Sequence, residues 1–232
     1  MCFSATASFA AAAVLTPLGG VALARAWRTD RRHLALAAFP ALFGLQQLFE
    51  GVLWLGLEDP AAPVPLGAAM AFLAFAYVLW PVLTPFAAFL VEPRPRLRRL
   101  FLGAAIFGGL YGLSLFAPLA LDPDWLRVEL ARNSIVYDTR LIYDDLVPRT
   151  VLRVIYAAVI CLPLLACTAP GVRTFGVLVT VSVAAAFLFA AHAFTSVWCF
   201  FAAATSAYVT VTTFRLPPRA PGRSDPPARP AA

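Results

Sequence analysis

Long apolar blocks constrain the fold of this chain more than any other feature of its sequence. Apolar residues occupy 61% of the 232 positions and charged residues 13%, whereas an average soluble domain is about half apolar and about a quarter charged. The apolar residues are grouped in blocks of about 20, the length of helix that crosses a hydrocarbon layer ~30 Å thick. An all-α integral membrane protein is therefore predicted.

Six such blocks follow one another, and the last is long enough for two helices. One helix of its length, about 40 residues, would measure roughly 60 Å, so the chain must turn back within this block, and we expect the turn at 190–196. The prediction is a seven-transmembrane-helix bundle in a single domain, residues 1–214. The blocks run over Ala5–Trp27, His33–Leu57, Leu66–Val91, Leu100–Leu121, Thr150–Thr168 and Thr174–Phe214.

Arginine positions predict the orientation of the bundle. The chain has no lysine, and 13 of its 18 arginines fall in the first, third and fifth loops and the C-terminal tail. Positive residues accumulate on the cytoplasmic side of membrane proteins, so the N-terminus is predicted outside and the C-terminus inside. The net charge of +6 is thus explained by topology, and no nucleic-acid partner is expected. The Pro- and Arg-rich tail, 215–232, is predicted to be a disordered cytoplasmic segment.

The use of arginine in place of all lysine indicates a GC-rich, bacterial genome. Together with the seven spans, it predicts a multi-pass protein of the bacterial inner membrane. The expected partners are membrane lipid and a lipid or small-molecule ligand, and the sequence leaves the oligomeric state open.

The loop 122–149 is expected outside the membrane and to contain a short β-hairpin. Apolar and charged residues alternate over 126–130, which is the period of a half-buried strand. Asn133-Ser134 is the expected turn, and Ile135–Tyr143 is rich in strand-forming residues. The hairpin is interpreted either as a lid or as a simple connector.

Glu50 is the only acid within the apolar blocks and the first candidate for chemistry. A lone charge at that depth costs several kcal/mol, so its carboxyl is expected to face the protein interior and to have a partner. Gln46 and Trp54 lie one turn before and after it on the same helical face, and with Gln47 they are candidate substrate-binding residues. Glu50 is interpreted either as a general acid/base, metal ligand or proton carrier, or as a structural carboxyl that contacts a neighbouring helix.

A second group of reactive side chains is predicted at the same outer depth. His192, Ser196 and Cys199 share one face if a single helix carries them. If the turn falls at Thr195, Ser196 instead caps the last helix. His192 is a candidate catalytic residue, and Ser196 and Trp198 are candidate substrate-binding residues.

Cys2 also maps to the outer side, where it is a candidate nucleophile. For Cys2 and Cys199 three interpretations stay open: a disulfide, metal ligands, or plain packing. With Glu50 and His192 the two cysteines form a candidate four-ligand set. Thiolate, imidazole and carboxylate suit zinc, and the soft sulfurs also suit Cu(I), so a zinc or copper site is one alternative.

Four stretches of the sequence resemble an uncharacterised family of bacterial multi-pass membrane proteins. The resemblance covers most of the chain except the outer loop and the tail. It implies membrane location and a multi-pass helical fold, and it implies no activity. The stretches are MCFSATASF at 1–9, LFGLQQLFEGVLW at 42–54, LWPVLTP at 79–85 and HAFTSVWCFFAA at 192–203.

Three hypotheses of function follow. The first is a membrane-embedded enzyme or metal-binding site that opens to the outer leaflet and acts on a lipid or apolar substrate, because the reactive side chains lie at one depth. The second is a small proton-coupled transporter or channel that uses Glu50. The third is a non-enzymatic sensor or structural membrane protein, with a Cys2–Cys199 disulfide and Glu50 as an interhelical contact.

Overall fold

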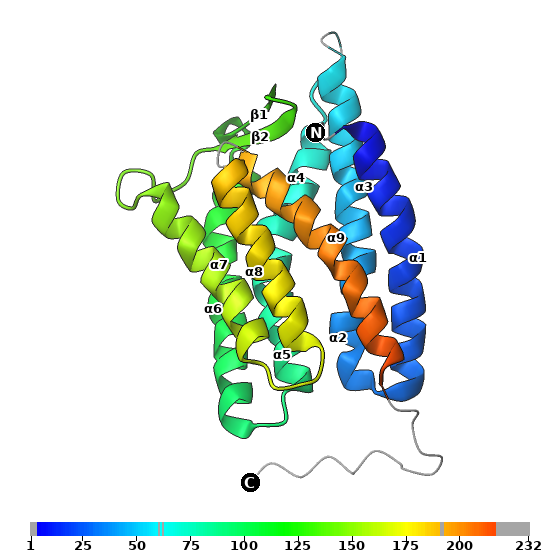
Figure 1. Cartoon of the computed structure of the whole chain (residues 1–232). Coiled ribbons are helices and arrows are strands. Elements are labelled where there is room, and N and C mark those ends of the chain that lie inside the picture. The colour runs from blue at the N-terminus through cyan, green and yellow to red at the C-terminus, as the bar shows by residue number, and fades with distance from the viewer. Residues whose placement is uncertain (1–3, 60, 62, 191–192, 217–232) are drawn as a thin grey trace.

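The computed structural model describes residues 4–59, 61, 63–190 and 193–216, most of which are helical (Figure 1). The predicted tail, 215–232, lies outside the described residues from position 217 onward. The elements in chain order are α1 Ala5–Thr29, η1 Arg31–His33, α2 Leu34–Ala37, α3 Phe39–Glu58, α4 Leu66–Ala74, η2 Phe75–Leu79, α5 Trp80–Val91, α6 Pro95–Leu121, η3 Pro123–Trp125, β1 Leu126–Ala131, β2 Ser134–Thr139, α7 Arg149–Ala166, α8 Val172–Phe189 and α9 Phe194–Phe214.

Seven helical stretches among the described residues are long and apolar enough to cross a membrane, with lengths of 18 to 28 residues. They confirm the seven long apolar helices that the blocks predict. The second stretch is interrupted at Ala38, where α2 passes into α3. The fourth starts at Pro95 rather than Leu100, because proline is favourable at the first helical position. The arginine-rich segment that follows Pro95 is therefore part of the helix. The expected turn between the last two helices lies between Phe189 and Phe194.

The third stretch contains a π-helical turn, η2, between α4 and α5. Pro81 has no N–H to donate to the carbonyl of Tyr77, so the regular hydrogen-bond ladder cannot continue there. The hydroxyl of Tyr156 on α7 donates to the carbonyl of Ala76 in this turn. Helix α6 packs closely against it, because a Cβ at Gly112 would overlap the Tyr77 carbonyl. The π turn is therefore held by two neighbouring helices.

Helix α9 runs obliquely through the bundle and packs against α1, α3 and α8 (Figure 1). Its buried residues recur at spacings of three and four, as expected for a helix with one face in the core. Contact with α3 brings its first turns opposite the polar face of that helix. The buried small and polar residues along this face are Ser196, Cys199, Ala203, Ser206, Thr210 and Thr213.

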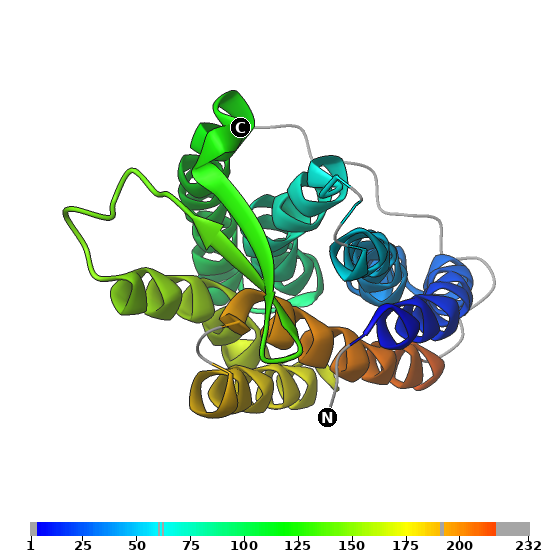
Figure 2. The same ribbon diagram turned by 90° about the horizontal axis from the view of Figure 1, so that it is seen from above.

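Strands β1 and β2 form the predicted hairpin, paired antiparallel from Leu126 opposite Thr139 to the turn. The turn is Arg132-Asn133, one residue earlier than predicted, because both residues adopt positive φ (52° and 56°), as a tight hairpin turn requires. The second strand ends at Thr139 rather than at position 143, because the Leu141 N–H donates to a side chain and not to a strand. The hairpin lies across one end of the bundle (Figure 2), which we call the hairpin end.

Candidate functional site

Glu50 lies in a buried hydrogen-bond group between α3 and α9. Its side chain is 2% exposed. Ser196 on α9 donates to one carboxyl oxygen, and Gln47 Nε2 donates to the other at 3.0 Å. The expectation that Glu50 faces the interior with partners is therefore confirmed, and its carboxyl ties two helices together at this level.

Gln46 joins the same region to three other elements. Its Oε1 accepts from Trp80 Nε1 at 2.8 Å, and its Nε2 lies 3.4 Å from the carbonyl oxygen of Phe72 and 3.5 Å from Cys199 Sγ. Both ends of the amide thus have protein partners. Neither Gln46 nor Gln47 lines the two cavities described below, so their predicted role in binding substrate stays a prediction without a cavity contact.

The other predicted residues of the last helix are buried and lie close to this group. Ser196 lies inside α9, which begins at Phe194, so it contacts Glu50 and does not cap the helix. Trp198 and Cys199 both line cavities. Trp54 on α3 is buried, and its indole N–H has no partner among the described residues.

Cys2 and His192 lie outside the described residues, so their predicted roles and the Cys2–Cys199 disulfide stay predictions. Among the residues that are described, no group of three or more His, Cys, Asp and Glu side chains could hold a metal ion. The zinc or copper alternative therefore has no support in this part of the chain.

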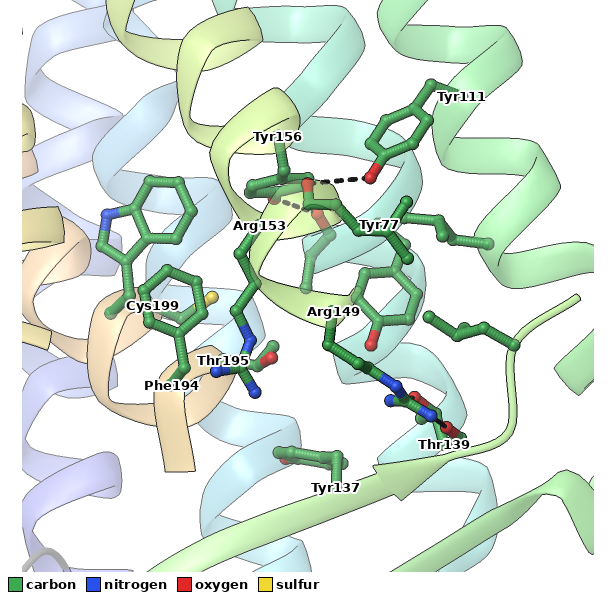
Figure 3. Close-up of a pocket in the computed structure, with 15 residues that line it drawn as sticks. Tyr77, Tyr111, Tyr137, Thr139, Arg149, Arg153, Tyr156, Phe194, Thr195 and Cys199 are labelled. Carbon is green, nitrogen blue, oxygen red and sulfur yellow. Dashed lines mark hydrogen bonds between the residues drawn. The ribbon is translucent and has the colours of Figure 1, made fainter. Parts of the chain in front are cut away.

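A cavity lies at the hairpin end between η2, α6, α7, α9 and strand β2 (Figure 3). Its empty space, mouth included, is about 650 Å³. No acid is found among the described residues that line it. We call it the Tyr/Arg pocket after its polar lining, which consists of Tyr77, Tyr111, Tyr137, Thr139, Arg149, Arg153, Tyr156, Thr195 and Cys199.

Two arginines one helical turn apart on α7 point into this pocket (Figure 3). Arg149 donates to the carboxylate of Asp144 at 2.7 Å and to the carbonyl of Thr139. Arg153 places its guanidinium carbon 5.3 Å from the ring centroid of Phe194. The described lining thus carries two guanidinium groups and no acid, and Asp144, which pairs with Arg149, lies outside it, so the pocket has a net positive charge.

Asp144 fastens the loop between β2 and α7 and with it Arg149. Its carboxylate accepts from the Leu141 N–H at 2.8 Å as well as from Arg149. Burial raises the pKa of Asp144, but these hydrogen bonds and the charge of Arg149 outweigh burial and hold the pKa below its ordinary value. The carboxylate is therefore ionised at neutral pH, and Arg149 is held at the mouth of the pocket.

Tyr137 extends from β2 over the pocket and carries an unused hydroxyl. Its ring stacks on Phe72, with centroids 5.0 Å apart and planes 4° from parallel. The hydroxyl is buried and has no hydrogen-bond partner among the described residues. Burial first, and then the negative charge of Glu50, raise the pKa of Tyr137 well above its ordinary value. The phenol therefore stays neutral and keeps its proton for a hydrogen bond.

The hydroxyls of two other pocket tyrosines already donate to the backbone. Tyr111 donates to the carbonyl of Leu152 at 2.9 Å, and Tyr156 donates to that of Ala76. These bonds fix the two rings as parts of the wall. Among these three tyrosines, Tyr137 alone keeps its donor available within the described part of the chain.

Glu50 does not line the Tyr/Arg pocket, although its charge acts on Tyr137 at the pocket wall. Its partner Ser196 is the neighbour in sequence of Thr195, which does line the pocket. The predicted acid therefore lies directly behind the pocket, within electrostatic reach of whatever binds there.

The sequence reasoning missed the arginines and tyrosines of this pocket as functional residues. The arginine distribution places Arg149 and Arg153 only among the five arginines on the outer side, opposite the 13 that set the orientation. A signal was present, because Arg149, Arg153 and Tyr156 recur at spacings of four and three and so share one helical face. The tyrosines on other helices gave no signal, because a single sequence does not say which faces meet.

The model of DUF6629, described as a family of unknown function, matches residues 1–223. No curated protein and no solved structure matches this chain. The match extends over all seven long helices and the hairpin, and it supplies no activity.

Proposed function

We propose that this chain, which belongs to the family of unknown function DUF6629, is an integral membrane protein that binds a small anionic molecule in its Tyr/Arg pocket. The observation that carries the proposal is the convergence of Arg149, Arg153 and the unused hydroxyl of Tyr137 on one cavity. All three are hydrogen-bond donors, and two are cations. Such a set fits a carboxylate or phosphate better than a neutral or cationic molecule.

The proposed setting is a bundle of seven membrane-spanning helices in the bacterial inner membrane, with the N-terminus outside and the C-terminus inside. The seven apolar helices and the one-sided distribution of arginine support it. In this orientation the hairpin end faces outward, and the Tyr/Arg pocket is reached from the outer side.

The cost of holding Arg153 within a helix of the bundle supports an anionic ligand. Its side chain is half-buried and lies in a helix long and apolar enough to cross a membrane. Charged residues in such helices are costly and mark binding sites or ion pathways. An anion that accepts hydrogen bonds from the guanidinium groups offsets this cost, since hydrogen bonds to charged groups contribute about 1.5–3 kcal/mol each.

The proposal predicts that small anions stabilise the folded protein through Arg153. Sodium hexanoate and inorganic phosphate are titrated against detergent-purified protein, and thermal unfolding is followed. At least one of them is expected to raise the Tm of the wild type, because a ligand at about 100 times its Kd stabilises the native state by about 2.7 kcal/mol. Arg153→Gln is expected to weaken binding about tenfold to a hundredfold.

Arg127→Gln is the matched control, because it removes the same charge from an exposed position on the hairpin. It is expected to keep the anion-dependent rise in Tm. If neither anion stabilises the wild type, or if both variants respond as the wild type does, the pocket is not an anion site.

Proton-coupled binding is a second candidate function, and the action of the Glu50 charge on Tyr137 favours it. An anion that binds at Tyr137 is a like charge to the Glu50 carboxylate and favours its protonated form. The neighbours of that carboxyl are the neutral side chains of Gln47, Ser196 and Tyr137 and the thiol of Cys199. Binding at the pocket would thus be linked to proton uptake behind it.

This candidate predicts proton uptake when the anion binds. In weakly buffered solution with a pH indicator, wild-type protein is expected to take up protons on adding hexanoate, and its affinity to rise as pH falls. The Glu50→Gln variant has no titratable side chain at position 50, so hexanoate is expected to bind to it without proton uptake. Equal proton uptake by the two proteins would exclude Glu50 as the coupled group.

A further inference from the structure

A second cavity lies beside the Tyr/Arg pocket, toward the middle of the bundle. It lies between α3, α5, α7, α8 and α9, and most of its lining side chains are apolar or aromatic, so we call it the apolar cavity. Its empty space, with the open solvent at its mouth included, is about 380 Å³. The lining residues that it does not share with the Tyr/Arg pocket are Phe39, Phe43, Trp80, Thr84, Ile160, Leu164, Phe175, Val179 and Ala202.

Three residues line both cavities, namely Tyr156, Trp198 and Cys199. The two spaces are therefore neighbours with a common wall. The side chains of these three residues separate the two spaces, so a molecule that occupies both must displace them. The lining of the Tyr/Arg pocket carries two guanidinium groups, whereas the lining of the apolar cavity carries no charged side chain.

The depth of the two cavities follows from helix α7, which lines both of them. Arg153 lies in the Tyr/Arg pocket, and Ile160 and Leu164 lie in the apolar cavity, two and three turns further along. At 1.5 Å per residue, the distance from Arg153 to Leu164 is roughly 16 Å along the helix axis. This distance exceeds the size of a simple anion and matches an extended hydrocarbon chain.

We propose that the ligand is a single-chain anionic amphiphile, such as a fatty acid, with its charged head in the Tyr/Arg pocket and its chain in the apolar cavity. This inference rests on the proposed function and specifies the ligand class of the same pocket. The head accepts hydrogen bonds from Arg153 and Tyr137. The chain packs between the rings of Phe43 and Trp80 on one side and Ile160 and Leu164 on the other.

The lining of the apolar cavity favours a chain over water or a polar extension. Apart from the shared residues, its hydroxyl-bearing side chain is Thr84, and the rest are apolar or aromatic. A water molecule needs two to four polar partners to be stable in a buried site. Of the two cavities described, one is apolar and borders the Tyr/Arg pocket, so a ligand with one chain is expected.

Trp80 provides a test of the chain's position, because it lines the apolar cavity and not the Tyr/Arg pocket. Bromine atoms quench tryptophan fluorescence on contact. Stearate brominated at the middle of its chain is added to detergent-purified protein, and the Trp80 contribution is taken as the difference between wild type and Trp80→Phe. Quenching of Trp80 is expected in the wild type, and about tenfold to a hundredfold more ligand is expected to be needed in Arg153→Gln.

Two controls locate the chain. Para-bromobenzoate, which carries bromine on a short anion, is expected to leave Trp80 unquenched in the wild type. Ala202→Phe fills the apolar cavity from α9 and is expected to abolish quenching by the brominated stearate, while Ala204→Phe on the exposed side of the same helix preserves it. The comparison of the two ligands needs only the wild type and Trp80→Phe.

The outcomes separate this inference from the proposed function. Hexanoate or phosphate that stabilises the protein through Arg153, combined with Trp80 fluorescence that mid-chain bromine does not change, overturns the chain's position and leaves the anion site intact. Quenching that Arg153→Gln and Ala202→Phe leave unchanged reflects partitioning into the detergent micelle and also overturns the inference. The absence of any Arg153-dependent binding overturns both proposals.

Discussion

The hydroxyl of Tyr137 and the guanidinium of Arg153 reach the same cavity from different elements, strand β2 and helix α7. Tyr137 differs from Tyr111 and Tyr156, whose hydroxyls donate to backbone carbonyls. A buried hydroxyl without a partner costs free energy in the folded state. The Tyr137 hydroxyl is in this state, and a ligand oxygen that accepts its hydrogen bond would remove the cost.

Tyr137→Phe and Tyr111→Phe are therefore predicted to have opposite effects. Tyr137→Phe removes a hydroxyl that has no described partner, so the free energy of unfolding is expected to stay unchanged or rise, while hexanoate binding weakens about tenfold. Tyr111→Phe loses the bond to Leu152 and is expected to lower the free energy of unfolding by about 1 kcal/mol. Chemical denaturation and isothermal titration calorimetry of the two variants measure these effects.

A loss of stability in Tyr137→Phe that exceeds that in Tyr111→Phe would mean that the Tyr137 hydroxyl has a structural partner. The assignment of its proton to a ligand would then be wrong.

Single residues could be predicted from the sequence when their chemistry was exceptional in its surroundings. Glu50 is the one acid in the apolar blocks, so its burial and its hydrogen bonding followed from the cost of a charge in hydrocarbon. Arg153 could not be separated in the same way, because it lies four residues into its helix, where a topology-setting arginine is also common. Tyr137 lies in the loop, and its burial depends on how the hairpin lies over the bundle.

At the scale of elements, the π turn η2 determines how Tyr77 and the Ala76 carbonyl face the pocket. Pro81 removes the N–H that would continue the regular ladder. Gly112 lets α6 approach the Tyr77 carbonyl, and Tyr156 binds the neighbouring carbonyl. The π turn thus depends on a proline in its own helix, on the missing side chain of Gly112 in α6 and on the hydroxyl of Tyr156 in α7.

Gly112→Ala is predicted to destabilise the protein and to disturb the pocket. The added methyl group would overlap the Tyr77 carbonyl, and overpacking of this kind costs about 1–3 kcal/mol. Gly103→Ala on the same helix meets no atom within 4 Å, so it is expected to be neutral or slightly stabilising, because alanine is the better helix former. Thermal unfolding of the two variants in detergent measures the difference.

Equal melting temperatures for the two glycine variants would contradict the close approach of α6 to η2. If Gly112→Ala is destabilised and also binds hexanoate more weakly than Gly103→Ala, the π turn supports the pocket as well as the fold.

Long elements could be predicted from the sequence and their irregularities could not. Block length gave the seven long helices, and alternation with a turn signal gave the hairpin. The π turn depends on contacts with two other helices as well as on Pro81. The end of β2 at Thr139 depends on the hydrogen bond of the Leu141 N–H to Asp144. The Tyr/Arg pocket could not be predicted from the sequence, because five elements contribute side chains to it.

At the scale of the whole molecule, the polar and apolar cavities are arranged along the bundle. The charged pocket lies under the hairpin, and the apolar cavity lies deeper between the helices. In the proposed orientation this order parallels that of a lipid leaflet, with charge at the surface and hydrocarbon below. An amphiphile could therefore bind with its head at the outer surface.

The orientation is predicted to be visible by cysteine labelling in intact cells. In a Cys2→Ala background, Arg132→Cys places a thiol at the exposed hairpin turn, and Arg96→Cys places one at the opposite end of α6. A membrane-impermeant maleimide is expected to label the first and to label the second only after the cells are permeabilised. Cys161, Cys167 and Cys199 are buried and are expected to react slowly.

If position 96 is labelled in intact cells and position 132 is not, the bundle has the opposite orientation in the membrane. The pocket would then open to the cytoplasm, and its ligand would come from that side.

Whether the Tyr/Arg pocket is an anion site can be decided by locating a bound anion in a crystal. Crystals of the protein grown with para-bromobenzoate are measured at the bromine absorption edge. We expect an anomalous peak inside the pocket, with the carboxylate facing Arg153 and Tyr137. Bromine bound elsewhere on the protein while the pocket holds none would contradict the proposed anion site.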